Sequence, residues 1–289
     1  MTIWDEIKES FKEGSALTRL IYINLGVFLT IRILNVFYFL SGEPFTLLEW
    51  LALPADFESL ASRPWTLFTY MFLHFDFLHI LFNLLWLFWM GQIFLSYFDQ
   101  KKLVTIYLLG GIAGGLVYVA GFNSLTVFQN VVADSKLLGA SASVIAIVMV
   151  LAVFVPNHTL NLMFLGEVKM KFIALISILL YIIGISSTNA GGNLAHLGGA
   201  FTGIIYALQL KRNIKTNKHD DGLFSKIGSL LAPKPKVKVS YKRPANEIEY
   251  NRQVNQEKEQ MNQILEKISK SGYDSLSKDE KEFLFRMGK

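Results

Sequence analysis

Apolar residues gather in long blocks along the chain as far as Arg212, instead of recurring on one face of a helix or a strand. An α-helix needs about 20 such residues to cross a bilayer. Six blocks approach this length, although the last two are slightly short. The pattern therefore predicts an all-α polytopic membrane protein, a bundle of six transmembrane helices. Their expected spans are 18–40, 74–97, 103–122, 138–155, 171–187 and 194–210.

Basic residues mark one side of the expected membrane. They lie before the first span, between the second and third, between the fourth and fifth, and after the sixth. By the positive-inside rule these connections face the cytoplasm, so we expect both termini there, in a cell (inner) membrane, with 1–17 as an N-terminal cytoplasmic segment. The residues are Lys8, Lys12, Arg19, Lys101, Lys102, Lys169, Lys171, Lys211, Arg212, Lys215 and Lys218.

The first outer loop, 41–73, is long and rich in apolar residues. It contains Pro44, Trp50, Pro54 and Trp65. A loop of this composition is too apolar for a solvated linker, and tryptophan favours the headgroup level of a membrane. We expect this loop to lie partly in the outer leaflet.

The composition changes after the six-helix membrane domain of 18–212. Residues 213–246 form a basic, proline-containing linker that carries Lys234, Lys236, Lys238, Lys242 and Arg243. Such a segment is attracted to anionic lipid by about 1 kcal/mol per basic residue near the surface. Aromatic residues are not interleaved with these charges at a spacing typical of nucleic-acid binding, so the membrane surface is favoured over nucleic acid as the partner.

The last segment, 247–289, predicts a small helical hairpin. Five apolar residues share one face of its first helix, Gly272 breaks that helix, and Ser277 with Glu280 forms a capping-box pattern. We expect the apolar face to be available to a partner or to the membrane surface, in a regulatory or tethering role. The five residues are Val254, Met261, Ile264, Leu265 and Ile268.

Polar residues inside the apolar blocks are the candidates for chemistry, because they are expensive in lipid. His79 and Asn83 are four residues apart and so share one helix face, with His74 slightly over one turn earlier. Two such donors can converge on one oxyanion. They can equally form a hydrogen-bonding pair that holds helices together, and the residues alone leave both readings open.

A serine and a histidine stand in two further blocks. Ser141 follows Gly139 and begins the fourth span, where its backbone N–H has no intrahelical partner. His196 lies in the sixth span ahead of Gly199 and Gly203, a spacing that permits close helix packing.

If the sixth helix docks on Ala142 and Ala146 of the fourth, His196 comes within hydrogen-bond reach of Ser141. This is the geometry of a nucleophile and its base. Asn193, about one turn before His196, could orient that histidine or a substrate. Intramembrane Asp or Glu is lacking nearby, so a dyad is predicted in place of a triad.

Together these residues resemble the rhomboid intramembrane serine proteases, over about 63–210. The family's His-x-x-x-Asn pattern falls on His79 and Asn83, and its preceding histidine on His74. Its Gly-x-Ser motif falls on Gly139 and Ser141, and its Ala-His-x-x-Gly-x-x-x-Gly motif on Ala195, His196, Gly199 and Gly203.

The resemblance implies cleavage of transmembrane segments near the outer membrane face. Ser141 would attack the carbonyl and His196 would take its proton, while His79, Asn83 and the Ser141 amide would hold the oxyanion. The chain departs from the family pattern at Ala142, where a glycine is usual, and at Ile145, where many members have an aromatic residue that packs on the histidine. It has Trp65-Thr66 where a Trp-Arg pair is common.

The alternatives belong to other functional classes. A catalytically silent relative could bind and escort transmembrane helices, although such a binder has no reason to keep both Ser141 and His196. A small-solute transporter would show broken helices and an internal repeat, which this sequence lacks. We expect no cofactor and no metal, because His74, His79 and His196 lack an H-E-x-x-H spacing.

Overall fold

The computed structural model describes residues 2–74, 76–162, 166–215 and 247–287. It divides the chain into two compact units, Met1–Lys234 and Pro235–Lys289, which are described separately. The predicted basic linker, including Lys234 to Arg243, lies almost entirely outside the described residues, and its contact with anionic lipid stays a prediction.

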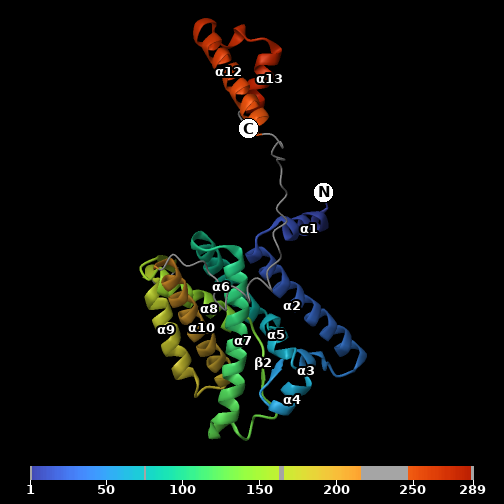
Figure 1. The fold of residues 1–289 in the computed structure, drawn as a ribbon. Coiled ribbons are helices and arrows are strands. Elements are labelled where there is room, and N and C mark those ends of the chain that lie inside the picture. Colours follow the sequence, from blue (N-terminus) through green and yellow to red (C-terminus); the bar gives the residue numbers. More distant parts are fainter. Residues whose placement is uncertain (1, 75, 163–165, 216–246, 288–289) are drawn as a thin grey trace. The chain divides into compact units, whose positions relative to one another are not determined.

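The first unit is built from long helices, and each predicted span corresponds to one of them (Figure 1). The all-α architecture is confirmed. Among the described residues, α2, α6 and α7 are long and apolar enough to cross a membrane, and α8 and α9 are shorter apolar helices. The helices are α1 Ile3–Glu13, α2 Ala16–Ser41, α6 Phe77–Tyr97, α7 Gln100–Ser124, α8 Ser141–Phe154, α9 Met170–Gly184 and α10 Ala190–Lys215.

Helix α8 is the centre of this unit. Ten of its 14 residues are buried, and these buried residues lie on all sides of the helix. Helices α7 and α10 pack most closely against it, and small residues at both contacts let the backbones approach. A helix in this position can carry a side chain that is shielded from lipid and water alike.

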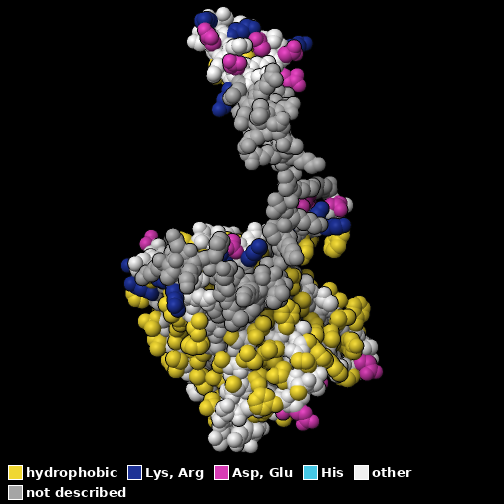
Figure 2. Space-filling view, viewed as in Figure 1, with side chains coloured by type: hydrophobic (Ala, Val, Ile, Leu, Met, Phe, Trp, Pro, Cys, Tyr) yellow, Lys and Arg dark blue, Asp and Glu magenta, His cyan; other side chains and the backbone are white. Residues whose placement is uncertain are grey.

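The outer surface of the bundle is apolar. Figure 2 shows hydrophobic side chains over its flank, with Lys and Arg gathered at one end. On α2, Leu29 and Ile33 are exposed, and on α9 Leu179 and Ile183 are exposed. Exposed apolar area of this extent is unfavourable in water and is satisfied by lipid.

The first outer loop is folded into short elements, a level of order that the sequence did not predict. They are α3 Leu47–Leu51, β1 Leu53–Pro54, α4 Phe57–Ser62, α5 Thr66–Thr69 and the 3₁₀ turn η1 Tyr70–Phe72. The Nε1–H of Trp65 donates to the carbonyl of Trp50 at 2.8 Å, and both rings are about half exposed. An apolar loop that exposes two indoles suits the membrane interface predicted for it.

The described part of the unit also has two small antiparallel sheets. Strand β1 pairs with β2, Lys136–Leu137, in the register Leu53↔Leu137, and this pairing joins the outer loop to the segment before α8. Strand β3, Thr159–Leu162, pairs with β4, Gly166–Lys169, between α8 and α9. The 3₁₀ turn η2, Thr126–Phe128, follows α7.

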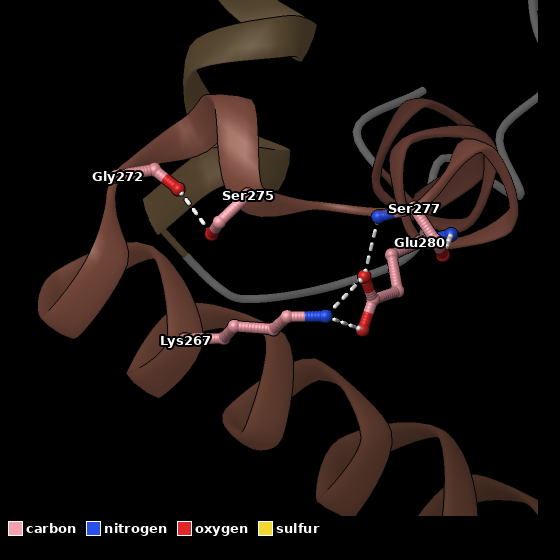
Figure 3. A network of polar contacts seen from close by, with 5 residues as sticks. All are labelled: Lys267, Gly272, Ser275, Ser277 and Glu280. Atoms are coloured by element: carbon pink, nitrogen blue, oxygen red, sulfur yellow. Dashed lines mark hydrogen bonds and ion pairs between the residues drawn. The ribbon is translucent and has the colours of Figure 1, made fainter.

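The second unit is the predicted hairpin, with α12 Glu247–Ser271, the turn η3 Tyr273–Ser275 and α13 Lys278–Met287. Figure 3 shows the ammonium of Lys267 between both carboxylate oxygens of Glu280, each at 2.9 Å. These bonds hold the pKa of Glu280 below its usual value. The same carboxylate accepts from the backbone N–H of Ser277 at 2.7 Å. The N–H of Glu280 donates to the Ser277 hydroxyl in return, which completes the predicted capping box.

The apolar stripe predicted for this hairpin is not available as a whole. Ile264 is buried against Leu276 and Phe283, and Met261 and Ile268 pack on the same cluster. The expectation of a free face was wrong at these positions, because the turn η3 and α13 fold back and cover them. Leu265 remains half exposed, and the Val254 side chain lies outside the described residues.

Candidate active site

Ser141 is the first residue of α8, and Ala140 is its N-cap residue. At this position the backbone N–H has no carbonyl of a preceding turn to bond with. The same terminus carries the partial positive charge of the helix dipole. The hydroxyl and an N–H donor of one residue therefore lie together at a site that favours negative charge.

Gly139 shapes the approach to this helix. Its φ of +131° is in the region that favours glycine, and its N–H donates to the carbonyl of Tyr70 at 3.0 Å. A Cβ atom at this position would lie 2.9 Å from Nε2 of His79. The absence of a side chain thus lets the His79 ring approach the start of α8.

The structure brings His196 of α10 to Ser141, with Nε2 at 2.6 Å from Oγ. Close packing of the two helices makes this possible. A Cβ atom on Gly199 would lie 2.2 Å from the carbonyl oxygen of Ala142, and one on Gly203 would lie 2.3 Å from that of Ala146. This is the helix contact that the small residues predicted, and the structure confirms it.

Tyr181 packs on the imidazole of His196, with ring centroids 4.4 Å apart and planes at 56°. The aromatic residue expected one turn after the serine is absent from that position, where the chain has Ile145. Helix α9 supplies it instead. Sequence spacing could not reveal this contact, because it depends on how α9 packs across the bundle.

The far nitrogen of His196, Nδ1, is buried without a hydrogen-bond partner among the described residues. A catalytic triad would place a carboxylate at this nitrogen. Among the described residues the site therefore holds a hydroxyl and an imidazole in contact, without a carboxylate at the far nitrogen.

A cavity of about 560 Å³ opens beside Ser141, between α6, α8 and α9. His79 and Asn83 lie on its wall together with Tyr181, and the remaining wall is mostly apolar. The Asn83 amide donates one N–H to the His79 carbonyl at 2.9 Å. An amide nitrogen has a second N–H, so one donor remains for a group in the cavity. The apolar lining is Leu78, Phe82, Trp86, Val144, Ile145 and Val148.

His74 supports the site from behind. It is buried, and its ring meets that of His79 edge-on, with centroids 5.1 Å apart and planes at 68°. Neither of its ring nitrogens has a hydrogen-bond partner among the described residues. The contact of the two rings restricts the orientation of His79.

Asn193 does not have the predicted role of orienting His196. Its amide donates to the carbonyl of Gly184 at 2.8 Å and to that of Asn189 at 2.9 Å. These bonds fasten the start of α10 to the end of α9. The expected contact with His196 is wrong because helical spacing placed Asn193 near His196 along the chain, whereas its side chain points toward the connection between the helices. The alternative role toward a substrate stays a prediction.

Comparison with known proteins finds two matching regions in the chain. A family model of the rhomboid domain matches residues 61–213. Residues 247–289 match a family of unknown function, DUF6576. The rhomboid proteases GlpG of Salmonella newport (strain SL254) and of Salmonella typhi are each 38% identical over 72 residues, which is 25% of this chain and 26% of the relative.

The chain thus spans about a quarter of the length of the curated relatives it matches. The rhomboid domain itself covers more of the sequence, since its 61–213 match is just over half of the chain. The helices α6, α8 and α9 that enclose the cavity, and the helix α10 that carries His196, lie within this match almost completely. The chain is a multi-pass membrane protein that belongs to the rhomboid family.

Proposed function

We propose that this protein is a serine endopeptidase that cleaves transmembrane segments of other membrane proteins. The observation that carries the proposal is the 2.6 Å separation of His196 Nε2 and Ser141 Oγ at the edge of a largely apolar cavity. A substrate helix that unwinds locally could present its backbone to Ser141 while its apolar side chains occupy the cavity.

The reaction follows from the positions of these groups. Ser141 Oγ attacks the substrate carbonyl carbon as His196 Nε2 takes the hydroxyl proton. The resulting oxyanion accepts hydrogen bonds from the Ser141 N–H and from the His79 and Asn83 side chains. Collapse of this intermediate breaks the peptide bond, and the proton on His196 passes to the leaving amine.

The second half of the reaction regenerates the enzyme. The acyl group remains on Ser141 as an ester after the amine leaves. His196 then removes a proton from a water molecule that attacks this ester, and returns it to Ser141 Oγ as the acid product departs. The ring of Tyr181, packed on the imidazole, keeps it in one orientation through both halves.

The membrane placement is part of the proposal. Basic residues at the cytoplasmic connections orient both termini toward the cytoplasm of a cell (inner) membrane. Ser141 begins α8 directly after the segment paired with the first outer loop, so cleavage would occur near the outer face. The linker of 213–246 would bind anionic lipid on the opposite side.

A serine-directed fluorophosphonate probe tests this function directly. The full-length protein in detergent is expected to form a covalent adduct at Ser141, located by mass spectrometry of its peptides. Ser143→Ala is the matched control, because Ser143 lies in the same helix turn, is buried and faces Gly111 of α7. This variant should label like the parent. A silent helix-binding relative would give no adduct at Ser141, and that result would overturn the proposal.

Removal of the oxyanion donors should slow the enzyme without stopping it. His79→Ala and Asn83→Ala are each expected to reduce kcat about 100- to 1,000-fold, because loss of one such donor costs about 2.7–4 kcal/mol of transition-state stabilisation. Cleavage of a model transmembrane substrate would measure this effect. If both variants turn over at the parent rate, these residues only hold the bundle together.

Truncation after Lys218 should leave cleavage of a simple substrate in detergent largely intact. The side chains that form the candidate site lie between His74 and His196, within the first unit. The truncated and full-length proteins would be compared at equal purity, with thermal unfolding as the control for folding. If the truncated protein folds correctly but is inactive, residues 219–289 are required for catalysis and this prediction is wrong.

A further inference from the structure

Helix α1 exposes an apolar face. Trp4, Ile7 and Phe11 are 71%, 43% and 42% exposed. Their spacing of three and four residues places them on one side of the helix. Glu9 and Glu13 lie on the opposite side at a spacing of four. This helix is therefore amphipathic. Within the described part of the first unit its apolar face is covered only in part, where Phe11 meets Tyr22 of α2.

Both ends of α1 are fixed by specific hydrogen bonds. At its start Thr2 and Asp5 form a capping box. Asp5 N–H donates to Thr2 Oγ1 at 3.2 Å, and Thr2 N–H donates to Asp5 Oδ2 at 3.0 Å. At its end the Arg19 guanidinium of α2 donates to the carbonyls of Phe11 at 3.0 Å and Lys12 at 2.7 Å. These bonds attach α1 to the start of the first membrane-spanning helix.

A second contact with α2 determines the level at which α1 lies relative to the membrane. The rings of Phe11 and Tyr22 stack with centroids 6.4 Å apart, and Ser10 Oγ lies 3.1 Å from the Tyr22 hydroxyl. Tyr22 directly precedes Ile23, where the exposed large apolar side chains of α2 begin. Tyrosine favours the level where headgroups meet acyl chains. Phe11 is thus held at the boundary of the hydrocarbon region.

The length of α2 agrees with this depth. The helix has 26 residues. At about 1.5 Å per residue it is roughly 39 Å long, which exceeds a hydrocarbon core of about 30 Å. The first turns of α2 therefore reach into the headgroup region. In Figure 1, α1 runs across the direction of the long helices, and Figure 2 shows hydrophobic side chains on its side toward the apolar flank of the bundle.

We propose that α1 is an interfacial anchor that lies flat in the cytoplasmic leaflet, with Trp4, Ile7 and Phe11 inserted among headgroups and upper acyl chains. The bilayer is the expected occupant of this face because the adjoining surface of α2 exposes the apolar side chains Ile23, Leu25 and Leu29, which suit lipid. This inference does not depend on the proposed protease activity.

The net charge of α1 shows whether its apolar face or its charged residues should draw it to a membrane. The sequence of α1 carries four acidic residues, Asp5, Glu6, Glu9 and Glu13, and two basic ones, Lys8 and Lys12. An anionic membrane would therefore not attract the helix by its net charge. Insertion should depend on the apolar face and should persist in vesicles without anionic lipid.

Single spin labels test the depth of each face. The chain has no cysteine, so Ile7→Cys and Glu9→Cys variants of the full-length protein each carry one label. Both would be reconstituted in phosphatidylcholine vesicles, with and without phosphatidylglycerol, and exposed to lipid-soluble oxygen or to a water-soluble nickel chelate. Trp4→Cys and Glu13→Cys provide an independent matched pair, and none of these four positions contacts Tyr22 through an observed bond or ring pair.

The labels at positions 7 and 4 are expected to relax faster with oxygen, and those at 9 and 13 faster with the nickel chelate, in both lipid mixtures. Equal access of the nickel chelate to all four positions would overturn the proposal. Shielding of positions 7 and 4 from both reagents would mean that protein covers this face, which also contradicts it. If positions 7 and 4 are in lipid only when anionic phosphatidylglycerol is present, electrostatic attraction holds the helix at the membrane, and the proposal of apolar anchoring is wrong.

Discussion

Cleavage of a model transmembrane substrate is expected to disappear when either Ser141 or His196 is replaced by alanine. The two side chains lie 2.6 Å apart and supply the nucleophile and the base of one proposed proton transfer. Because such residues act as a unit, loss of either typically costs on the order of 10⁶-fold in kcat. For the same reason the double variant should be no less active than either single variant.

The controls for this experiment come from the same helices. Ser143→Ala removes a buried hydroxyl from α8 without touching the pair, and should leave turnover close to that of the parent. Ser141→Ala and His196→Ala should insert in the membrane and unfold near the parent temperature, since neither change removes much apolar area. Substantial residual cleavage by Ser141→Ala would assign the nucleophile to another residue.

The second large effect is expected at Gly199, where even one added carbon should be damaging. A Cβ atom there would lie 2.2 Å from the carbonyl oxygen of Ala142, and a backbone atom of a neighbouring helix cannot turn aside as a side chain can. Gly199→Ala should therefore separate α10 from α8 and lengthen the bond between His196 and Ser141. Overpacking of this kind typically costs about 1–3 kcal/mol of folding free energy. The larger Gly199→Val should lose activity altogether.

Gly26→Ala is the matched control, because a Cβ atom on Gly26 of α2 would meet nothing within 4 Å. It makes the same chemical change in another membrane-spanning helix. Turnover and thermal unfolding of the two variants would be measured side by side. If Gly199→Ala is as active and as stable as Gly26→Ala, the close contact of α8 and α10 is not what positions His196.

The sequence predicted the elements whose signals are local. Each apolar block is a helix. The small residues at Gly199 and Gly203 indicated the contact of α10 with α8, because close packing requires small residues on both partners. The approach of His196 to Ser141 followed from that one contact. These predictions succeeded because a single interface determined them.

Contacts that need a third element could not be predicted in this way. Tyr181 reaches His196 from α9, and no spacing in the sequence relates the two residues. From the sequence, Ile264 belongs to an apolar stripe that looks exposed, but in the structure Phe283 of α13 covers it. The amphipathic face of α1 could in principle be recognised from its apolar residues, but the mixture of charges around them hid its periodicity.

The sheet between β1 and β2 has a consequence for how the position of Ser141 is maintained. Leu53 pairs with Leu137, Ala55 N–H donates to the Ser135 carbonyl at 3.0 Å, and the Tyr70 carbonyl accepts from Gly139 N–H at 3.0 Å. The segment that leads to Ser141 is therefore aligned by a part of the chain from which two membrane helices, α6 and α7, separate it in sequence. Distance along the sequence is a poor guide to which substitutions disturb the serine, since a shift of the backbone at Tyr70 is transmitted to the turn before α8 through one hydrogen bond.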